Sequence, residues 1–230
     1  MNSTVSKLIS AMLVSGLVLA SQNAFSSTTL TYQGAAFPNY QTVHTSYADG
    51  AGGYPDFGDK HVYVGGFKMG VGNTNQSITA WCVDVFDWLH SATYSNGNFT
   101  SINHYDKLQQ LANQRYASVT NAETSAAFQL AVWEIVTETG NTFKLDSGQF
   151  KAWGGNTTAI AMANDWLKLD KTTGNRDYKI DYYFYGNMPN GVTQNLVSIS
   201  PVPLPAAGLL MASALGLGGL FARRRTSAKK

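Results

Sequence analysis

Two residues of this 230-residue chain suggest a specific reaction: its single cysteine, Cys82, and a glutamine in an apolar segment, Gln129. Cys82 lies in the stretch TAWCVDVFDW, and no second cysteine is present to form a disulfide. Gln129 interrupts the run AAFQLAVWEIV, and helical spacing places it on the same face as Ala126, Val132 and Val136. That face should be buried, and a buried amide without partners costs about 1–3 kcal/mol.

Two interpretations of Gln129 follow from this pattern. In the first, the backbone or a water molecule satisfies the amide. In the second, the sulfur of Cys82 attacks the side-chain amide carbon of Gln129, ammonia leaves, and an internal thioester forms. The second reaction removes the amide donor from the core and gives the lone thiol a partner. It also closes the loop that runs from Cys82 to Gln129.

The sequences around both residues resemble the two motifs of bacterial thioester domains, which occur in surface adhesins. WCVDV is similar to their aromatic-Cys-apolar-acid motif, and FQLAVW is similar to their apolar-Gln motif that ends in tryptophan. The resemblance implies that Cys82 is the thioester sulfur and Gln129 the acyl donor. It also implies that Trp133 packs near the bond and that Asp84 orients the strand or the site by hydrogen bonds. The implied function is covalent attachment to an amine- or hydroxyl-bearing surface, once per molecule, and not turnover by an enzyme.

A thioester must be kept away from water until its target arrives. Four aromatic residues that can form a dry wall are Trp81, Trp88, Phe128 and Trp133. Core packing explains the same residues equally well. An attacking lysine is mostly protonated at neutral pH, so a nearby base would help. His90 and His104 are closest in sequence to Cys82, and each can equally be a surface or loop histidine.

The elements that must position these residues follow a mixed pattern. Segments rich in β-branched and aromatic residues predict strands at residues 29–33, 42–47, 61–69, 77–85, 178–186 and 191–200. Periodicity predicts helices at residues 104–116, 120–140 and 157–170. Thr120 and Glu123 form a candidate capping box, and Gly140 is a candidate helix stop. The order favours one α+β domain over residues 27–200, with an antiparallel sheet or sandwich and a central helical insertion.

Residues 1–26 have the pattern of a secretory signal peptide. Lys7 precedes the apolar stretch 8–20, and Ala24, Phe25 and Ser26 form a small-x-small cleavage site. We therefore expect cleavage and export. The alternative is an N-terminal membrane anchor, for which the apolar stretch is short compared with the roughly 20 residues of a spanning helix.

Residues 201–230 combine a proline motif, an apolar segment and a basic cluster. The motif is Val202, Pro203, Leu204, Pro205 and Ala206. Residues 206–222 carry no charge and are just long enough to span a membrane. The basic cluster, which the positive-inside rule keeps cytoplasmic, consists of Arg223, Arg224 and Arg225. A permanent tail anchor would fit this pattern as well.

The same order resembles the PEP-CTERM sorting tails of Gram-negative bacteria, in the variant that carries Val-Pro-Leu-Pro-Ala. The resemblance implies cleavage near the prolines by an exosortase, after transient residence in the inner membrane through residues 206–222. The mature protein is then expected at the cell surface, at the outer membrane or outside the cell, with a role in adhesion or biofilm.

The charge balance excludes some partners. Without the two end segments, the body keeps 10 Lys and Arg against 14 Asp and Glu, a net charge of −4. It therefore offers no basic patch for nucleic acid. Four scattered histidines and one cysteine lack metal-ligand spacing. Asp49, Asp56 and Asp59 lie in a glycine-rich loop, but their spacing differs from that of a calcium loop. We expect no metal and no cofactor.

Two other functions are alternatives to covalent adhesion. A structural protein of the extracellular polysaccharide matrix would bind without a covalent bond, and Tyr182, Tyr183 and Tyr185 could stack on sugars. One alternating face of that strand should instead be core. A cysteine hydrolase is disfavoured, because no protease motif surrounds Cys82 and the charge of Asp84 opposes a thiolate.

Overall fold

The computed structural model describes residues 27–47, 57–85, 87–97, 102–170, 177–187 and 192–202. The predicted signal peptide, residues 1–26, lies outside the described residues. The same holds for the predicted sorting signal beyond Val202, namely Pro203, Leu204, Pro205, Ala206, the apolar stretch 206–222, Arg223, Arg224 and Arg225. Among the helices that the structure describes, none is both long and apolar enough to cross a membrane.

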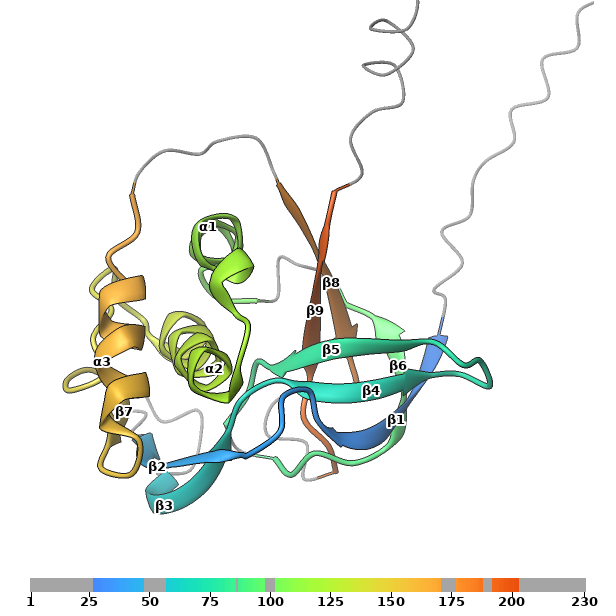
Figure 1. The fold of residues 1–230 in the computed structure, drawn as a ribbon, viewed down its shortest axis with the longest axis horizontal. Coiled ribbons are helices and arrows are strands. Elements are labelled where there is room, and N and C mark those ends of the chain that lie inside the picture. Colours follow the sequence, from blue (N-terminus) through green and yellow to red (C-terminus); the bar gives the residue numbers. More distant parts are fainter. Residues whose placement is uncertain are drawn as a thin grey trace, which may run out of the picture.

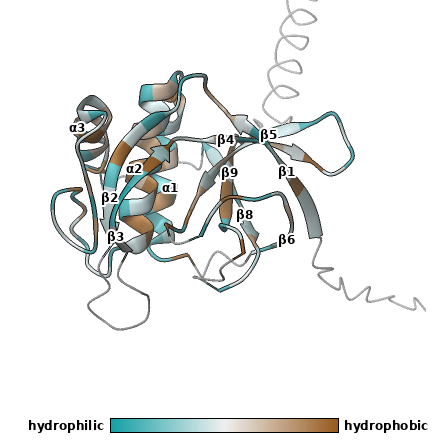
Figure 2. Ribbon diagram, turned by 90° about the horizontal axis from the view of Figure 1, so that it is seen from below, coloured by the Kyte–Doolittle hydropathy of each residue, from teal (hydrophilic) through white to brown (hydrophobic). Residues whose placement is uncertain are grey.

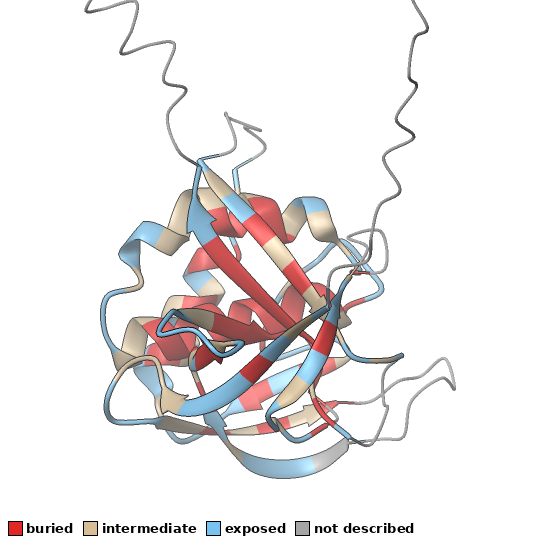
Figure 3. Ribbon diagram, turned by 90° about the vertical axis from the view of Figure 1, so that its right-hand side faces the viewer, coloured by how far each residue is buried: buried red, intermediate tan, exposed pale blue. Residues whose placement is uncertain are grey.

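Six antiparallel strands close into a barrel in the order β1-β4-β5-β9-β8-β6 (Figure 1). They are β1 (Ser27–Ala35), β4 (Phe67–Val71), β5 (Ser77–Cys82), β6 (Ala92–Asn96), β8 (Tyr178–Phe184) and β9 (Leu196–Pro201). Pairing of β1 with β6 completes the barrel, so each of its described strands is paired on both sides. Figure 3 shows bands of buried residues that interrupt the exposed ones along these strands.

A second antiparallel sheet lies beside the helices, in the strand order β3-β2-β7 (Figure 1). Its strands are β2 (Gln41–Tyr47), β3 (Phe57–Val64) and β7 (Phe150–Trp153). The helices are α1 (Tyr105–Arg115), the 3-10 turn η2 (Tyr116–Ser118), α2 (Ala122–Thr137) and α3 (Thr157–Trp166). The central helix α2 contacts α1, α3, the barrel strand β5 and all three strands of the second sheet.

The prediction of a mixed α+β domain with antiparallel sheets is confirmed, but the sheets do not form a sandwich. Six strands make a barrel and three make a separate sheet. The helical part is also not one uninterrupted insertion, because β7 separates α2 from α3. Helix α2 packs against both groups of strands, because it contacts β5 of the barrel and all three strands of the second sheet.

Residues 61–69, predicted as one strand, divide at Gly65 and Gly66 into β3 and β4 of different sheets. Gly65 has a φ of 144°, which favours glycine, and a Cβ there would lie 3.1 Å from Oγ of Ser125. A Cβ on Gly66 would lie 2.9 Å from the ring of Trp81. The two glycines let the chain leave one sheet and enter the other in close contact with α2 and β5.

Helix α2 is the most buried element of the described chain. Every residue from Ser125 to Val136 is buried, and Figure 2 shows strongly hydrophobic residues along this helix. A helix that is apolar on all sides belongs in the interior. It begins after Asn121 and ends at Thr137, so the predicted capping box of Thr120 and Glu123 and the predicted stop at Gly140 are wrong.

The observed cap of α2 consists of Asn121 and Thr124. Oδ1 of Asn121 accepts from the Thr124 amide at 2.9 Å, and Oγ1 of Thr124 accepts from the Asn121 amide at 3.0 Å. We expect Asn121→Ala to lower the free energy of unfolding by about 1 kcal/mol, because the first turn of the helix loses its side-chain acceptor. Denaturant unfolding measures the loss. Thr120→Ala is the control and should stay within about 0.5 kcal/mol of wild type, since the Thr120 side chain lies outside this cap.

Candidate functional site

Cys82 and Gln129 lie next to each other in the interior. Cys82 is the last residue of β5 and pairs with Leu196 of β9, so the barrel fixes its backbone. Gln129 lies in the middle of α2, which packs against β5. Both residues have an exposed fraction of 0%. The fold therefore brings together two side chains that the sequence separates by 47 positions.

Two hydrogen bonds join the side chain of Gln129 to the backbone of Cys82. The Cys82 amide donates to Oε1 of Gln129 at 2.9 Å, and Nε2 of Gln129 donates to the carbonyl oxygen of Cys82 at 2.8 Å. The buried amide is thus satisfied by backbone, as in the first interpretation of the sequence. Its backbone partner is the candidate nucleophilic residue itself, so the same contacts also place the amide carbon beside Cys82.

One bond of this pair polarises the Gln129 carbonyl group in a direction that favours acyl transfer. The amide of Cys82 donates to the oxygen that would become negative if a nucleophile attacked the amide carbon. A backbone donor in that position stabilises an oxyanion, and it does so most strongly where water is excluded. Nε2, the leaving nitrogen, is held on the other side by the Cys82 carbonyl.

A third residue, Gln194, contacts the thiol directly. Sγ of Cys82 donates a hydrogen bond to Oε1 of Gln194, which precedes β9 and is half-buried. Sequence reasoning missed this residue. The available signal was the polar triplet Thr193, Gln194 and Asn195 placed directly before the apolar strand that begins at Leu196.

Asp84 fixes the chain after Cys82 to the chain before β9. Its Oδ2 accepts from the Asn195 amide at 2.7 Å, and the Val83 amide donates to the Asn195 carbonyl oxygen at 3.1 Å. Asp84 and Asn195 are both fully buried. These bonds continue the hydrogen bonding between β5 and β9 for one residue pair beyond Cys82 and Leu196. Asp84 therefore helps to fix the backbone on both sides of the thiol.

Trp133 lies one helical turn after Gln129 and packs over the same segment. Its Nε1 donates to the carbonyl oxygen of Asp84 at 3.2 Å, and its ring meets Phe150 edge-on at 5.8 Å between centroids. The side chain is 5% exposed. Gln129 and Trp133 therefore bind the backbone of Cys82 and Asp84 from consecutive turns of α2.

The thiol of Cys82 lies in surroundings that keep it protonated. Burial raises its pKa well above the ordinary value, and the negative charge of Asp84 raises the pKa further. A neutral thiol is a weak nucleophile, so any reaction with Gln129 depends on geometry more than on a ready thiolate.

The four aromatic residues predicted as a dry wall divide into two groups. Trp81 and Phe128 are fully buried and meet edge-on at 4.8 Å between centroids, and Trp133 packs as described above. Trp88 has an exposed fraction of 82%, so its predicted place in a dry wall is wrong. The chain has left the core by this position, since His90 already lies at the surface beside Thr193.

The two candidate bases have their described contacts away from the thiol. The backbone amide of His90 donates to Oγ1 of Thr193 at 3.0 Å, so the His90 backbone lies beside the residue that precedes Gln194. No contact described for the His90 ring reaches Gln194 or the thiol. His104 occupies the start of α1 with a φ of 50°, and its Nε2 contacts the carbonyl oxygen of Glu138 at 2.9 Å. Glu138 caps the far end of α2, so His104 belongs to a different region.

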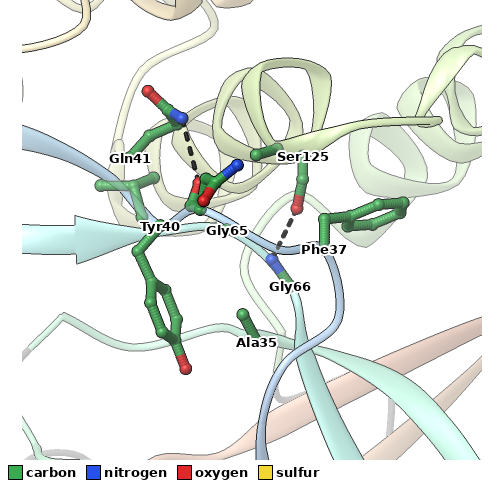
Figure 4. Close-up of a pocket in the computed structure, with 10 residues that line it drawn as sticks. Ala35, Phe37, Tyr40, Gln41, Gly65, Gly66 and Ser125 are labelled. Atoms are coloured by element: carbon green, nitrogen blue, oxygen red, sulfur yellow. Dashed lines mark hydrogen bonds between the residues drawn. The ribbon is translucent and has the colours of Figure 1, made fainter.

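The small hollow in Figure 4 lies at the start of α2, and Cys82 is not among the residues that line it. Its lining includes Phe37, Tyr40, Gly65 and Ser125, and the Gly66 amide donates to Oγ of Ser125 at 2.9 Å. Its volume of about 10 Å³ is room for one water molecule. It does not accommodate an organic ligand.

In the described part of the chain, no group of three or more His, Cys, Asp and Glu side chains could hold a metal ion. Asp49 and Asp56 of the acidic loop lie outside the described residues. Asp59 contacts Nδ1 of His44 at 2.9 Å on the exposed face of the second sheet.

Comparison of the chain with protein-family models, with curated proteins and with solved structures finds no match.

Proposed function

We propose that this protein forms an internal thioester between Cys82 and Gln129 and uses it to attach covalently to an amine- or hydroxyl-bearing surface. In the first step, the bond between Sγ and the side-chain carbon Cδ of Gln129 forms, and the bond between Cδ and Nε2 breaks. The thiol proton leaves with Nε2 as ammonia. In the second step, which requires the buried site to open locally, a surface amine or hydroxyl adds to Cδ, the bond between Cδ and Sγ breaks, and Cys82 regains its proton.

The observation that carries this proposal is the pair of hydrogen bonds between the Gln129 side chain and the Cys82 backbone. They hold the amide against the residue that carries the thiol, in a place where both side chains have no exposed surface. Exclusion of water protects a thioester from hydrolysis. Because each molecule reacts once and is not regenerated, we propose an adhesin and not an enzyme.

The proposed place of action is outside the cell. The proposal rests on the signal-peptide pattern of residues 1–26 and on the sorting pattern from Val202 to Arg225. An exosortase would cleave near the proline motif while residues 206–222 span the inner membrane, and the product would reach the cell surface or the extracellular matrix. Mature protein that still carried Arg223, Arg224 and Arg225 would contradict this route.

Methylamine labelling tests the thioester. We expect freshly isolated wild-type protein to be lighter than its sequence by one ammonia and to gain one methylamine on treatment, because the amine attacks Cδ. Peptide mapping by mass spectrometry should place the methylamide on Gln129 and a free thiol on Cys82. Mass is the necessary readout, because a buried thiol with a raised pKa is unreactive whether or not it is bonded.

The control for this experiment is Cys82→Ala, which should show the full calculated mass and take up no methylamine. A wild-type protein with the full calculated mass, and with no methylamine uptake, would contradict the thioester.

The alternative is a non-covalent component of a polysaccharide matrix, and one observation favours it. The Gln129 amide already has two backbone partners, so it can remain buried without reacting. Of the tyrosines suggested for sugar stacking, Tyr182 is buried at 5% exposure, so only Tyr183 and Tyr185 remain partly accessible. Normal retention of Cys82→Ala at the cell surface would support this alternative.

A further inference from the structure

The residues on both sides of Gln194 along the chain are buried and hydrogen-bonded. Thr193 before it is fully buried, and its Oγ1 accepts from the His90 amide at 3.0 Å and contacts the hydroxyl of Tyr94 at 3.2 Å. Asn195 after it is also fully buried, and its backbone amide donates to the Asp84 carboxylate at 2.7 Å. The backbone that carries Gln194 is therefore preorganised relative to β5 and Cys82.

The Asn195 side chain adds further bonds to this framework. Its Oδ1 accepts from the Tyr185 amide at 2.7 Å, and its Nδ2 donates to the Gly186 carbonyl oxygen at 2.9 Å. The segment before β9 is thus tied to the chain after β8 as well as to the chain after β5. Together these bonds hold a segment in which the Gln194 side chain points at the sulfur.

Two glutamine amides therefore meet Cys82, and they contact different parts of it. Gln129 bonds to the backbone amide and carbonyl, whereas Gln194 accepts the hydrogen of the thiol. A thiol has one hydrogen, so its direction decides where the sulfur lone pairs point. When the thiol hydrogen points at Gln194, the sulfur lone pairs point elsewhere and can face another neighbour. The side chain of Gln129 is such a neighbour, because it is hydrogen-bonded to the backbone of Cys82.

We propose that Gln194 is the positioning residue for thioester formation: it holds the Cys82 thiol so that its sulfur lone pair faces Cδ of Gln129. This inference rests on the proposed thioester and assigns a role in making it. Gln194 itself is unchanged in the reaction, since the proton leaves with Nε2 of Gln129 in ammonia. A neutral acceptor suits this role, because it orients the thiol without adding a second negative charge to that of Asp84.

The test compares the rate of ammonia loss in the full chain of wild type, Gln194→Ala and Gln194→Glu. Protein is sampled at intervals after synthesis is stopped, and its intact mass gives the fraction with the bond. We expect Gln194→Ala to slow bond formation by about tenfold or more, because the thiol loses its preferred direction. Gln194→Glu keeps an acceptor at this position and should restore the rate at a pH where the new carboxyl group is protonated and neutral, so its rate should depend on pH in a way that wild type lacks.

Gln110→Ala is the matched control, because Gln110 is a half-buried glutamine on α1 whose side chain contacts Lys107 and not Cys82. It should form the bond at the wild-type rate. Melting temperatures of all variants show whether a slow rate reflects unfolding, and rescue by Gln194→Glu separates positioning from a loss of packing.

The outcomes separate this inference from the proposed function. Wild-type protein that loses ammonia while Gln194→Ala loses it equally fast would overturn the positioning role alone. Wild-type protein that never loses ammonia would overturn both. A methylamide mapped to Gln194 in place of Gln129 would reverse the roles of the two glutamines and overturn the inference as well.

Discussion

Protein that carries the Cys82–Gln129 bond should be more stable than protein without it by about 4 kcal/mol, because the cross-link restricts the unfolded chain as a disulfide of the same span does. The bond joins residues that lie 47 positions apart, so the loop that it closes is long. For a domain of this size the difference corresponds to a shift in melting temperature of about 8–16 °C. This effect is large compared with the small free energy that separates folded from unfolded domains.

Methylamine-opened wild type is the best reference for this measurement. It keeps the buried sulfur of Cys82, whereas Cys82→Ala removes that sulfur and leaves a small cavity. Denaturant unfolding of bonded and opened protein gives the contribution of the cross-link together with the effect of the methylamide on the buried Gln129. Equal unfolding midpoints for the two forms would show that the bond does not restrain the unfolded chain.

We expect the free energy of unfolding of wild type to decline as the pH rises. Glu134→Gln should remove most of that decline. Glu134 is fully buried on α2, and its Oε1 accepts from the Lys144 amide at 2.6 Å. Within the described residues, its Oε2 has no hydrogen-bond partner. Burial raises its pKa to about 9, and the nearby charges of Glu138 and Asp146 act in the same direction.

The sign of the effect follows from where the proton is held. Between pH 4.5 and about 9 the folded protein keeps the Glu134 proton, whereas the unfolded chain has lost it. The stability contributed by Glu134 is therefore complete below pH 4.5 and declines as the pH rises, by at most about 1.4 kcal/mol per unit. Glutamine does not titrate, so the variant should equal or exceed wild type at pH 8 and match it more closely at pH 5.

Unfolding curves measured from pH 5 to pH 8 (about half a unit apart) provide the comparison. Glu123→Gln is the control on the same helix, and it should keep the wild-type pH dependence because it leaves Glu134 in place. Parallel pH profiles for wild type and Glu134→Gln would show that Glu134 is ionised in the folded protein.

The sequence identified the candidate reaction because the residue types were unusual in their local surroundings. One cysteine without a partner and one amide in an apolar run can be recognised without knowing any contact. The same local patterns predicted the helix around Gln129 and the strand that ends near Cys82, and both are present. Short-range periodicity and polarity are sufficient for predictions of this kind.

Other features depended on residues that are distant along the chain. β6 and β7 were not predicted, because strands as short as ATYSN and FKAW carry too little alternation to be recognised alone. Their identity comes from pairing with β1, β8 and β2. The exposure of Trp88 likewise depended on where the chain leaves the barrel. The local sequence does not distinguish Trp88 from the buried Trp81.

Sequence patterns alone were enough to assign an α+β domain and to single out Cys82 and Gln129 as the residues to consider. The folded chain was needed to learn that six strands close into a barrel, that Gln129 meets the backbone of Cys82, and that Gln194 meets its thiol. The difference arises because local patterns report on burial, whereas hydrogen-bond partners 47 and 112 positions apart are chosen by strand pairing and helix packing.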